Sequence, residues 1–338
     1  MSGARIKENT YKAGNISIRI GCGSRCRFSS LQSYLALDPC EGRDDPRPDA
    51  TLTLLESGTD MLDKLIPLPG EEYLISENTL LVDRPVPYRV YTRGSQRWSD
   101  FSGFGRSLVD RERGLAKAVI LRENGISPVY TDILFGYNLL MGLLHKFGYM
   151  SVHASCVRIG GQGVLFTGKS GSGKSTAACA MLSRGHPVLA DDRILLRKES
   201  GAFSALSISD VVKLDSRNIG KFFPGLASAR PLHLVKNELY LKITSTENLR
   251  YAAKARIESL IVFERTGLAM SRAENISPSR VVGDLFPVTI GDHRPDETSK
   301  KFNFLMELLE TVSCYRVYFG TDMGDFVRCI ENITGKEI

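Results

Sequence analysis

Residues 163–176 read GVLFTGKSGSGKST, and this stretch decides the fold. It fits the phosphate-binding pattern G-x-x-x-x-G-K-[ST] and stands between an apolar, strand-forming run and a helix-forming run that reaches Leu182. The order predicts a backbone that turns tightly at the glycines and aims the first N–H groups of a helix at an anion. The predicted nucleotide-binding residues are Gly168, Lys169, Ser170, Gly171, Ser172, Gly173, Lys174, Ser175 and Thr176.

Two side chains of this loop have further predicted roles. Lys174 is expected to reach the outer phosphates of a nucleoside triphosphate, and Ser175 is expected to ligate magnesium. The alternative is a chance match in a glycine-rich turn. Because strand, loop and helix occur in the required order, the sequence favours the phosphate-binding interpretation.

A pair of carboxylates, Asp191 and Asp192, follows the apolar run Val188–Ala190. This position predicts that both lie at the end of a strand beside the glycine-rich loop. One could hold magnesium, directly or through water, while the other acts as a base for phosphoryl transfer. The alternative is one ordinary magnesium-binding acid followed by a turn or cap residue.

His153 lies 21 residues before Lys174, on a predicted strand over Ser151–Ile159. A hairpin through Gly160 and Gly161 would return its side chain to the triphosphate end of the site. A lone histidine on a strand is more often structural, so this residue alone does not indicate catalysis.

Length and composition predict two domains. The chain has 338 residues and is 42% hydrophobic, which is ample for conventional cores. We predict a β-rich N-terminal domain over residues 1–128 that recognises substrate or mediates assembly, a connecting helix over 129–148, and an α/β P-loop domain over 149–338. Predicted N-terminal strands are Ile16–Ile20, Thr51–Leu55, Tyr88–Tyr91 and Leu115–Leu121.

The C-terminal half alternates predicted strands and helices, which indicates an α/β core. The segment Leu214–Pro231 contains Gly and Pro and is predicted to form a loop over the site. Later predicted strands are Leu239–Ile243, Ser259–Phe263 and Cys314–Phe319, and predicted helices are Pro278–Leu285, Thr298–Val312 and Met323–Ile333.

Charge and hydropathy narrow the partners and the location. The 44 Lys plus Arg against 38 Asp plus Glu give a modest +6, which favours anionic small ligands over nucleic acid. Only Asp132–Met150 approaches membrane-span length, and its polar residues favour a buried helix without a membrane span. Met1–Asn15 lacks the apolar core of a signal peptide, and the seven cysteines are dispersed, so we expect a cytoplasmic protein with reduced thiols.

Three stretches together carry a family resemblance: His153–Ser155, Gly163–Thr176 and Arg184–Arg193. Their residues and spacing resemble the C-terminal catalytic domain of the HPr kinase/phosphorylase superfamily. The resemblance implies a mixed sheet with flanking helices, as in phosphoenolpyruvate carboxykinase-like P-loop domains, and ATP with Mg as phosphoryl donor.

The resemblance also implies roles for individual residues. His153, Lys174, Asp191 and Asp192 would be catalytic, with Asp192 accepting the proton of a seryl hydroxyl. Asp191 would support Asp192 or join Ser175 in holding the metal.

Two departures modify this picture. The glycine- and arginine-rich signature that accompanies phosphorylase activity and the hexamer is not found after the aspartates, and the N-terminal region does not resemble that of the bifunctional enzyme. The chain is more similar to divergent stand-alone kinases of the superfamily, including those of peptide-natural-product maturation. The implied partner is a peptide or small-protein substrate, in a protein that could be a homo-oligomer, and phosphorylase activity is not expected.

Two other functions stay open from the sequence. The same site could phosphorylate a small metabolite such as an amino acid or sugar. A non-catalytic nucleotide-sensing module is the second alternative, although a sensor needs neither the aspartate pair nor His153.

Several other side chains are candidates of less specific character. Asp210 or Asp215 could add a metal carboxylate, and the single tryptophan, Trp98, is expected to pack in a core. A basic set could clamp substrate, although a solvated surface is the usual role of such residues: Lys236, Lys242, Arg250, Lys254 and Arg256.

Overall fold

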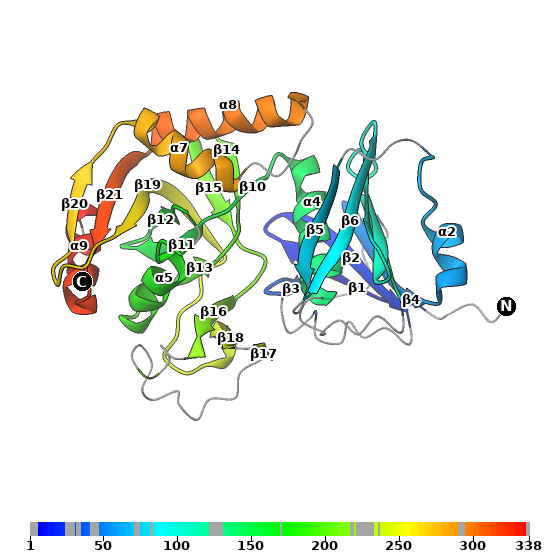
Figure 1. Cartoon of the computed structure of the whole chain (residues 1–338), viewed down its shortest axis with the longest axis horizontal. Coiled ribbons are helices and arrows are strands. Elements are labelled where there is room, and N and C mark those ends of the chain that lie inside the picture. The colour runs from blue at the N-terminus through cyan, green and yellow to red at the C-terminus, as the bar shows by residue number, and fades with distance from the viewer. Residues whose placement is uncertain are drawn as a thin grey trace. The chain divides into compact units, whose positions relative to one another are not determined.

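The chain divides into two compact units, Met1–Tyr149 and Met150–Ile338, and each is described by itself. The structure is a computed structural model (Figure 1). It describes residues 6–23, 31, 35–40, 47–70, 75–81, 84–121, 131–169, 171–216, 220, 233–235, 237–289 and 295–335.

The N-terminal unit is built on one nine-stranded mixed sheet with the strand order β3-β1-β2-β4-β9-β8-β7-β6-β5. Alternating buried and half-buried side chains along β4 show one face turned to a core. The strands are β1 (Ile6–Ala13), β2 (Ile16–Gly23), β3 (Asp38–Pro39), β4 (Ala50–Ser57), β5 (Ile75–Leu81), β6 (Arg84–Arg93), β7 (Gln96–Phe101), β8 (Gly105–Asp110) and β9 (Leu115–Leu121). A short helical segment follows β4, with η2 (Thr59–Met61) and α2 (Leu62–Leu65).

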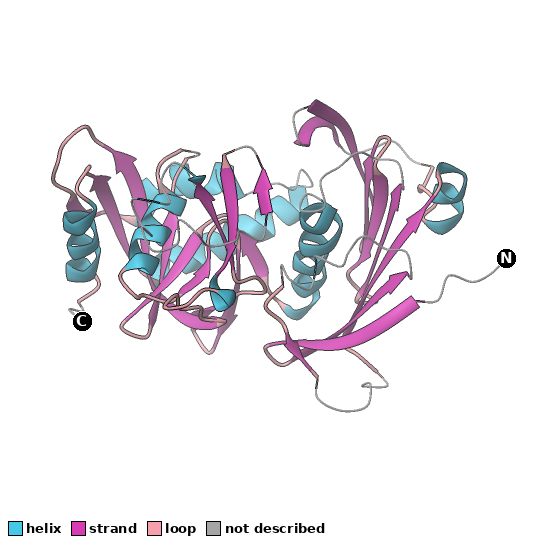
Figure 2. Cartoon of the chain, turned by 90° about the horizontal axis from the view of Figure 1, so that it is seen from below, coloured by secondary structure: helices cyan, strands magenta, loops and turns pink. Residues whose placement is uncertain are grey.

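A helical segment packs on this sheet. It comprises the π-helix η3 (Asp132–Tyr137), α4 (Asn138–Leu144) and the 3-10 turn η4 (His145–Phe147), so the predicted helix is present but changes its hydrogen-bonding pattern twice. Figure 2 shows α4 beside the strands, and its contacts are with β4, β8 and β9. The apolar character of this segment is therefore explained by burial against a sheet. Among the described residues, no helix combines the length and apolarity needed to cross a membrane.

The C-terminal unit has a central mixed sheet with the order β10-β14-β15-β19-β12-β11-β13, extended by β21 beside β19 and β20 beside β21. Its strands are β10 (Met150–Val152), β11 (Ser155–Ile159), β12 (Gln162–Thr167), β13 (Val188–Ala190), β14 (Ile194–Glu199), β15 (Ala202–Leu206), β19 (Lys254–Arg265), β20 (Arg272–Asn275) and β21 (Ser313–Phe319). Its helices are α5 (Lys174–Ser183), α7 (Pro278–Thr289), α8 (Pro295–Thr311) and α9 (Met323–Ile333).

Both faces of the central sheet are covered. Alternate residues of β12 serve different cores: Val164 and Phe166 pack with α5 and α9, while Leu165 packs with α7 and α8. A strand buried on both faces must be apolar throughout, which explains the continuous run GVLF before the glycine-rich loop. The result is a layered mixed α/β unit, as the sequence predicts.

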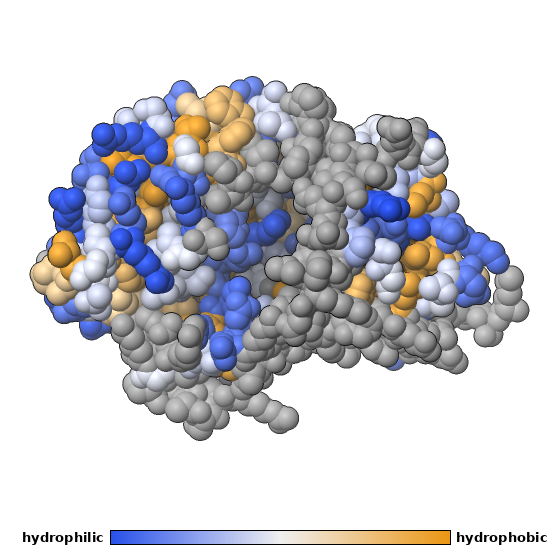
Figure 3. Space-filling model, in the orientation of Figure 1, coloured by the Kyte–Doolittle hydropathy of each residue, from blue (hydrophilic) through white to orange (hydrophobic). Residues whose placement is uncertain are grey.

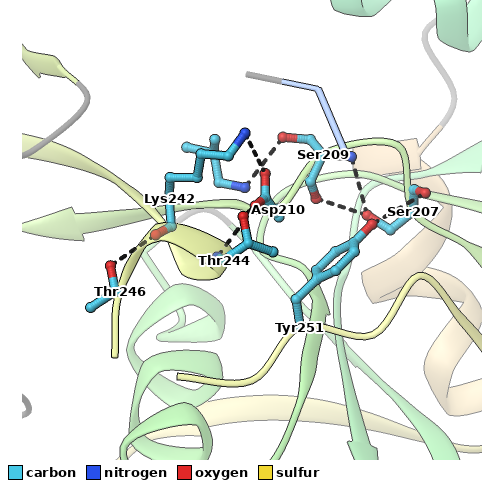
Figure 4. A network of polar contacts seen from close by, with 8 residues as sticks. Ser207, Ser209, Asp210, Lys242, Thr244, Thr246 and Tyr251 are labelled. Atoms are coloured by element: carbon cyan, nitrogen blue, oxygen red, sulfur yellow. Dashed lines mark hydrogen bonds and ion pairs between the residues drawn. The ribbon is translucent and has the colours of Figure 1, made fainter. Parts of the chain in front are cut away.

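A small second sheet has the order β16-β18-β17, with β16 (Val211–Asp215), β17 (His233–Val235) and β18 (Glu238–Lys242); the turn η7 (Ile243–Ser245) follows it. Figure 4 shows the polar network at its base, around the buried Asp210. The carboxylate of Asp210 accepts hydrogen bonds from the backbone N–H and hydroxyl of Thr244 and lies 3.5 Å from Lys242 Nζ. Asp210 thus joins the start of β16 to the end of β18.

Most predicted C-terminal elements are confirmed, α9 at its predicted bounds. One prediction is wrong in detail: Ser151–Ile159 is not one strand, because β10 pairs with β14 and β11 pairs with β12 and β13. The predicted hairpin through Gly160 and Gly161 is confirmed by the β11–β12 pairing. The predicted loop Leu214–Pro231 begins inside β16, and most of the rest lies outside the described residues.

Replacing Asp210 by Ala should destabilise the C-terminal unit, because it removes the buried carboxylate that accepts the Thr244 hydroxyl and pairs with the Lys242 amine. We expect a loss of about 2 kcal/mol in the free energy of unfolding, measured by urea titration. Glu247→Ala, at an exposed neighbouring position, is the control and should stay within about 0.5 kcal/mol of the wild type. Equal stabilities of the two variants would contradict the assigned role.

Candidate functional site

The glycine-rich loop connects the end of β12 to the start of α5. Gly168, Gly171 and Gly173 have φ values of 133°, 78° and 110°, a range that only glycine adopts without strain. A Cβ atom on Gly168 would also lie 2.9 Å from Ser172 Oγ. The glycines predicted from the motif are therefore required by the backbone path. Ser170 lies outside the described residues.

Lys174 is the first residue of α5, and its side chain folds back across the loop. Its amine donates to the carbonyl oxygens of Gly168 at 2.8 Å and Lys169 at 3.2 Å, and the residue is only 8% exposed. Burial lowers the pKa of Lys174, and the nearby carboxylates of Asp192 and Asp191 partly oppose this shift. The loop, its lysine and the aspartate pair are thus close enough to share one electrostatic environment.

Asp191 is buried directly after β13. Its Oδ2 accepts the backbone N–H of Lys213 at 2.9 Å, and its backbone carbonyl accepts the hydroxyl of Ser155. Burial raises the pKa of Asp191 to about 6, although hydrogen bonds from Lys213 and Ser175 act in the opposite direction. The carboxylate is held between β11, β16 and the first turn of α5.

Asp192 is the exposed member of the pair. Its side chain is 67% exposed, and its Oδ1 lies 3.3 Å from Nδ1 of His153. Burial lowers the pKa of His153; the Asp192 charge opposes this, while Lys174 and other nearby cations reinforce it. The lowered pKa favours neutral His153 at pH 7, and its contact with Asp192 orients a carboxylate that solvent can reach.

The site residues lie close together because of how the strands of the central sheet pair. Ser155 pairs with Phe166 and Cys156 pairs with Ala190, so the start of β11, the end of β12 and the end of β13 share one edge of the sheet. His153 lies in the break between β10 and β11, immediately before this edge. The structure thereby brings together His153, Lys174, Asp191 and Asp192, with Ser175 and Thr176 half-buried in the first turn of α5.

Other sequence candidates lie elsewhere. Asp210 belongs to the network of Figure 4, and Trp98 is buried in the N-terminal core. Lys242 pairs with Asp210, and Lys254 pairs with Glu199. Of the remaining members of the basic set, Arg250 is exposed and Arg256 pairs with Glu258. Lys236 lies outside the described residues.

Sequence reasoning missed Lys213. Its backbone N–H binds Asp191, and its amine lies 3.1 Å from Glu238 Oε1 on the neighbouring strand β18. Despite burial, the charges of Glu238, Asp192 and Asp191 raise the pKa of Lys213. No local signal marks this lysine, because its proximity to Asp191 depends on how the small sheet packs against the large one.

The region around the glycine-rich loop is similar to a known protein family. Residues 147–213 match the family described as HPr Serine kinase C-terminal domain, a segment that includes His153, the glycine-rich loop and both aspartates. Over this segment, the chain is similar to the C-terminal domain of HPr kinases. The family match confirms the resemblance that the three sequence stretches indicate.

Similar proteins named HPr kinase/phosphorylase match over limited lengths. The protein of Leptospira biflexa is 30% identical over 133 residues, 38% of either chain. That of Chlorobium luteolum is 47% identical over 51 residues, 15% of either chain. That of Bacillus cereus is 40% identical over 72 residues, 21% of this chain and 23% of the relative. The chain thus spans well under half the length of these HPr kinase family members.

A solved structure titled as the Hpr(Ser) kinase/phosphatase from Coxiella burnetii is 14% identical and has a TM-score of 0.30. The alignment covers 55% of this chain and 96% of that one. The similarity to HPr kinases rests on the matched sequence segment.

The buried carboxylate predicts a pH-dependent stability. Because the folded-state pKa of Asp191 is raised from 3.8 to about 6, the native state binds more protons than the unfolded state between these values, and the stability contribution falls as pH rises through this window. Asp191→Asn removes the effect. Relative to the wild type, we expect the variant to gain on the order of 2 kcal/mol in unfolding free energy between about pH 4.5 and pH 7.5, measured by denaturant titration with chelator. A difference independent of pH would contradict the assigned burial.

Proposed function

We propose that this protein is an ATP- and Mg-dependent kinase that transfers the γ-phosphoryl group to a hydroxyl, foremost serine, of a peptide or small protein. The observation that carries the proposal is the contact of Asp192 with His153 at 3.3 Å, at the sheet edge where the glycine-rich loop also lies. Phosphoryl transfer requires clamped phosphates, neutralised charge and an oriented nucleophile. The described residues suit each requirement.

Phosphate binding is supported by the loop itself. The hydroxyl oxygen of Ser172 is buried and has no hydrogen-bond partner among the described residues, which suits a donor that serves an anionic ligand. A Cβ on Gly171 would meet no atom within 4 Å, so the space beside this loop residue is open. Lys174 supplies a buried cation whose present acceptors are loop carbonyls. A triphosphate would offer this amine stronger, charged acceptors.

Magnesium is supported by the donor set. Ser175 and Asp191 share a hydrogen bond, and together they offer a hydroxyl and a carboxylate of the kind that bind this ion. Among the described residues, no cluster of three or more histidine, cysteine or acidic side chains suits a metal. Mg²⁺ is commonly held by one or two carboxylates together with substrate phosphates, and bound there it would neutralise phosphate charge.

Asp192 is assigned as the base. Its exposed carboxylate can accept the proton of the attacking hydroxyl, while His153 holds its orientation. The γ-phosphorus–oxygen bond forms on the acceptor, and the bond to the β-phosphate oxygen breaks to leave ADP.

A protein acceptor is favoured by the relatives named HPr kinase/phosphorylase, and a small metabolite would require the same site. The sensing module is disfavoured, because it needs neither an exposed base nor its histidine partner. The use of ATP agrees with the cytoplasmic location that the sequence predicts. We also propose that the protein can form a homo-oligomer.

The roles of Asp192 and Lys174 can be separated. Asp192→Asn should bind ATP with near wild-type affinity but lose phosphoryl transfer by roughly 10²–10⁴-fold, because the base is removed and the phosphate loop is intact. Transfer is measured with γ-labelled ATP, Mg²⁺ and cell extract split into macromolecular and small-molecule fractions. Lys174→Ala is the control that should lose transfer through weakened phosphate binding.

The fraction that takes up the label identifies the acceptor class. Label in macromolecules supports the peptide or protein kinase, and Lys174-dependent label in a small molecule other than free phosphate supports the metabolite kinase. Normal transfer by Asp192→Asn would overturn the assignment of the base.

A further inference from the structure

The glycine-rich loop follows β12, and different strands flank β12 on its two sides. On one side lie β11 and β13, which carry the edge with His153 and the aspartate pair. On the other side lies β19, parallel to β12, followed by β21, parallel to β19. The ends of β12, β19 and β21 therefore face the same edge, and ligands of open α/β sheets bind outside such strand ends.

This arrangement fixes the direction of a bound nucleotide. If the terminal phosphate faces Asp192, the remainder of the nucleotide must leave the loop on the opposite side, over the ends of β19 and β21. This step rests on the proposed function, since it takes Asp192 as the group at the reacting phosphate.

Arg265 stands at the start of that path. It is the last residue of β19, three positions beyond Val262, which pairs with the end of β12 at Thr167. Its Nε and Nη2 lie 3.5 and 3.7 Å from the position that a Cβ on Gly173 would occupy. An exposed guanidinium thus borders the glycine-rich loop on the side away from the aspartates.

The segment Thr266–Ser271 after Arg265 is firmly held. The N–H of Thr266 donates to Phe319 O at 3.1 Å, and the carbonyls of Leu268 and Ala269 accept the N–H groups of Thr321 and Asp322 at 3.0 Å. The N–H of Ser271 donates to a carboxylate oxygen of Asp325 at 2.6 Å. These bonds fix the segment against the residues that follow β21.

A close backbone contact adds to this restraint. A Cβ on Gly320 would lie 2.5 Å from the Ala269 carbonyl oxygen, so the two segments approach more closely than any other residue would allow.

Two apolar side chains project from this fixed segment into solvent. Leu268 is 66% exposed and Met270 is 62% exposed, the largest values among the exposed large hydrophobic residues in the described part of the chain. Figure 3 shows apolar colour at the left end of the C-terminal unit, where the β19–β20 connection lies in Figure 1. A loop that holds a leucine and a polarisable methionine in water offers an apolar surface on which a flat ligand can stack.

We infer that Arg265 and the segment Thr266–Ser271 form the nucleoside subsite of this protein. Arg265 lies beside the phosphate nearest the ribose, and Leu268 and Met270 pack against the face of the purine base. The subsite gives the phosphate loop its preference for a nucleotide over an inorganic polyphosphate.

The test compares two ligands on the full chain: ATP and inorganic tripolyphosphate, each with Mg²⁺, by isothermal titration calorimetry. The double variant Leu268→Ser/Met270→Ser should bind ATP about tenfold more weakly and tripolyphosphate with unchanged affinity, because only ATP carries a base to lose its apolar contact. Leu115→Ser, at an exposed leucine of the N-terminal unit, is the matched control and should leave both affinities unchanged.

Each other result overturns the subsite. Unchanged ATP affinity in the double variant would show that Leu268 and Met270 do not contact the purine base. If that variant also transfers less phosphate to macromolecules, the loop binds the acceptor instead. Equal weakening of both ligands assigns it to support of the phosphate loop.

A different binding result would contradict the proposed kinase function itself. Wild-type protein would then bind neither ligand, or Lys174→Ala would bind both as well as the wild type does.

Discussion

The pairing of β12 with an antiparallel strand on one side and a parallel strand on the other is the constraint on which the site depends. The antiparallel partner, β11, returns the chain to the edge where β12 ends, and β13 beside it delivers Asp191 and Asp192 there. The parallel partner, β19, ends at that edge with Arg265. A register shift of one residue would turn alternate side chains to the other face and separate these groups.

The side chains at this edge differ in how deeply they are buried. Asp191 and Lys174 are almost fully covered, and burial raises the pKa of Asp191 and lowers the pKa of Lys174. Asp192 remains exposed and keeps contact with His153. Two adjacent carboxylates thus occupy different environments, one buried and one exposed to solvent. The backbone N–H of Lys213 links Asp191 to the small sheet. Asp210 in turn binds Thr244, just after the last strand of that sheet.

Local chemistry explains which features the sequence reveals. The glycine-rich loop and α9 are predictable because turn glycines and helical periodicity act over a few residues. The break between β10 and β11 at His153 is not predictable, since it arises when two short strands pair with different partners. The contact of Lys213 with Asp191 likewise requires residues 22 positions apart to meet across two sheets. The strands β1, β7 and β8 escape prediction because polar residues interrupt their apolar pattern.

The central proposal is that a nucleotide lies across the ends of β13, β12 and β19 in a single direction. A crystal structure of the full chain with Mg²⁺ and a non-hydrolysable ATP analogue tests it most directly. We predict the terminal phosphate beside Asp192, the inner phosphates in the glycine-rich loop and the base against Leu268 and Met270. A nucleotide in the reverse direction, with its base beside Asp192, or one bound away from the loop, would contradict the account.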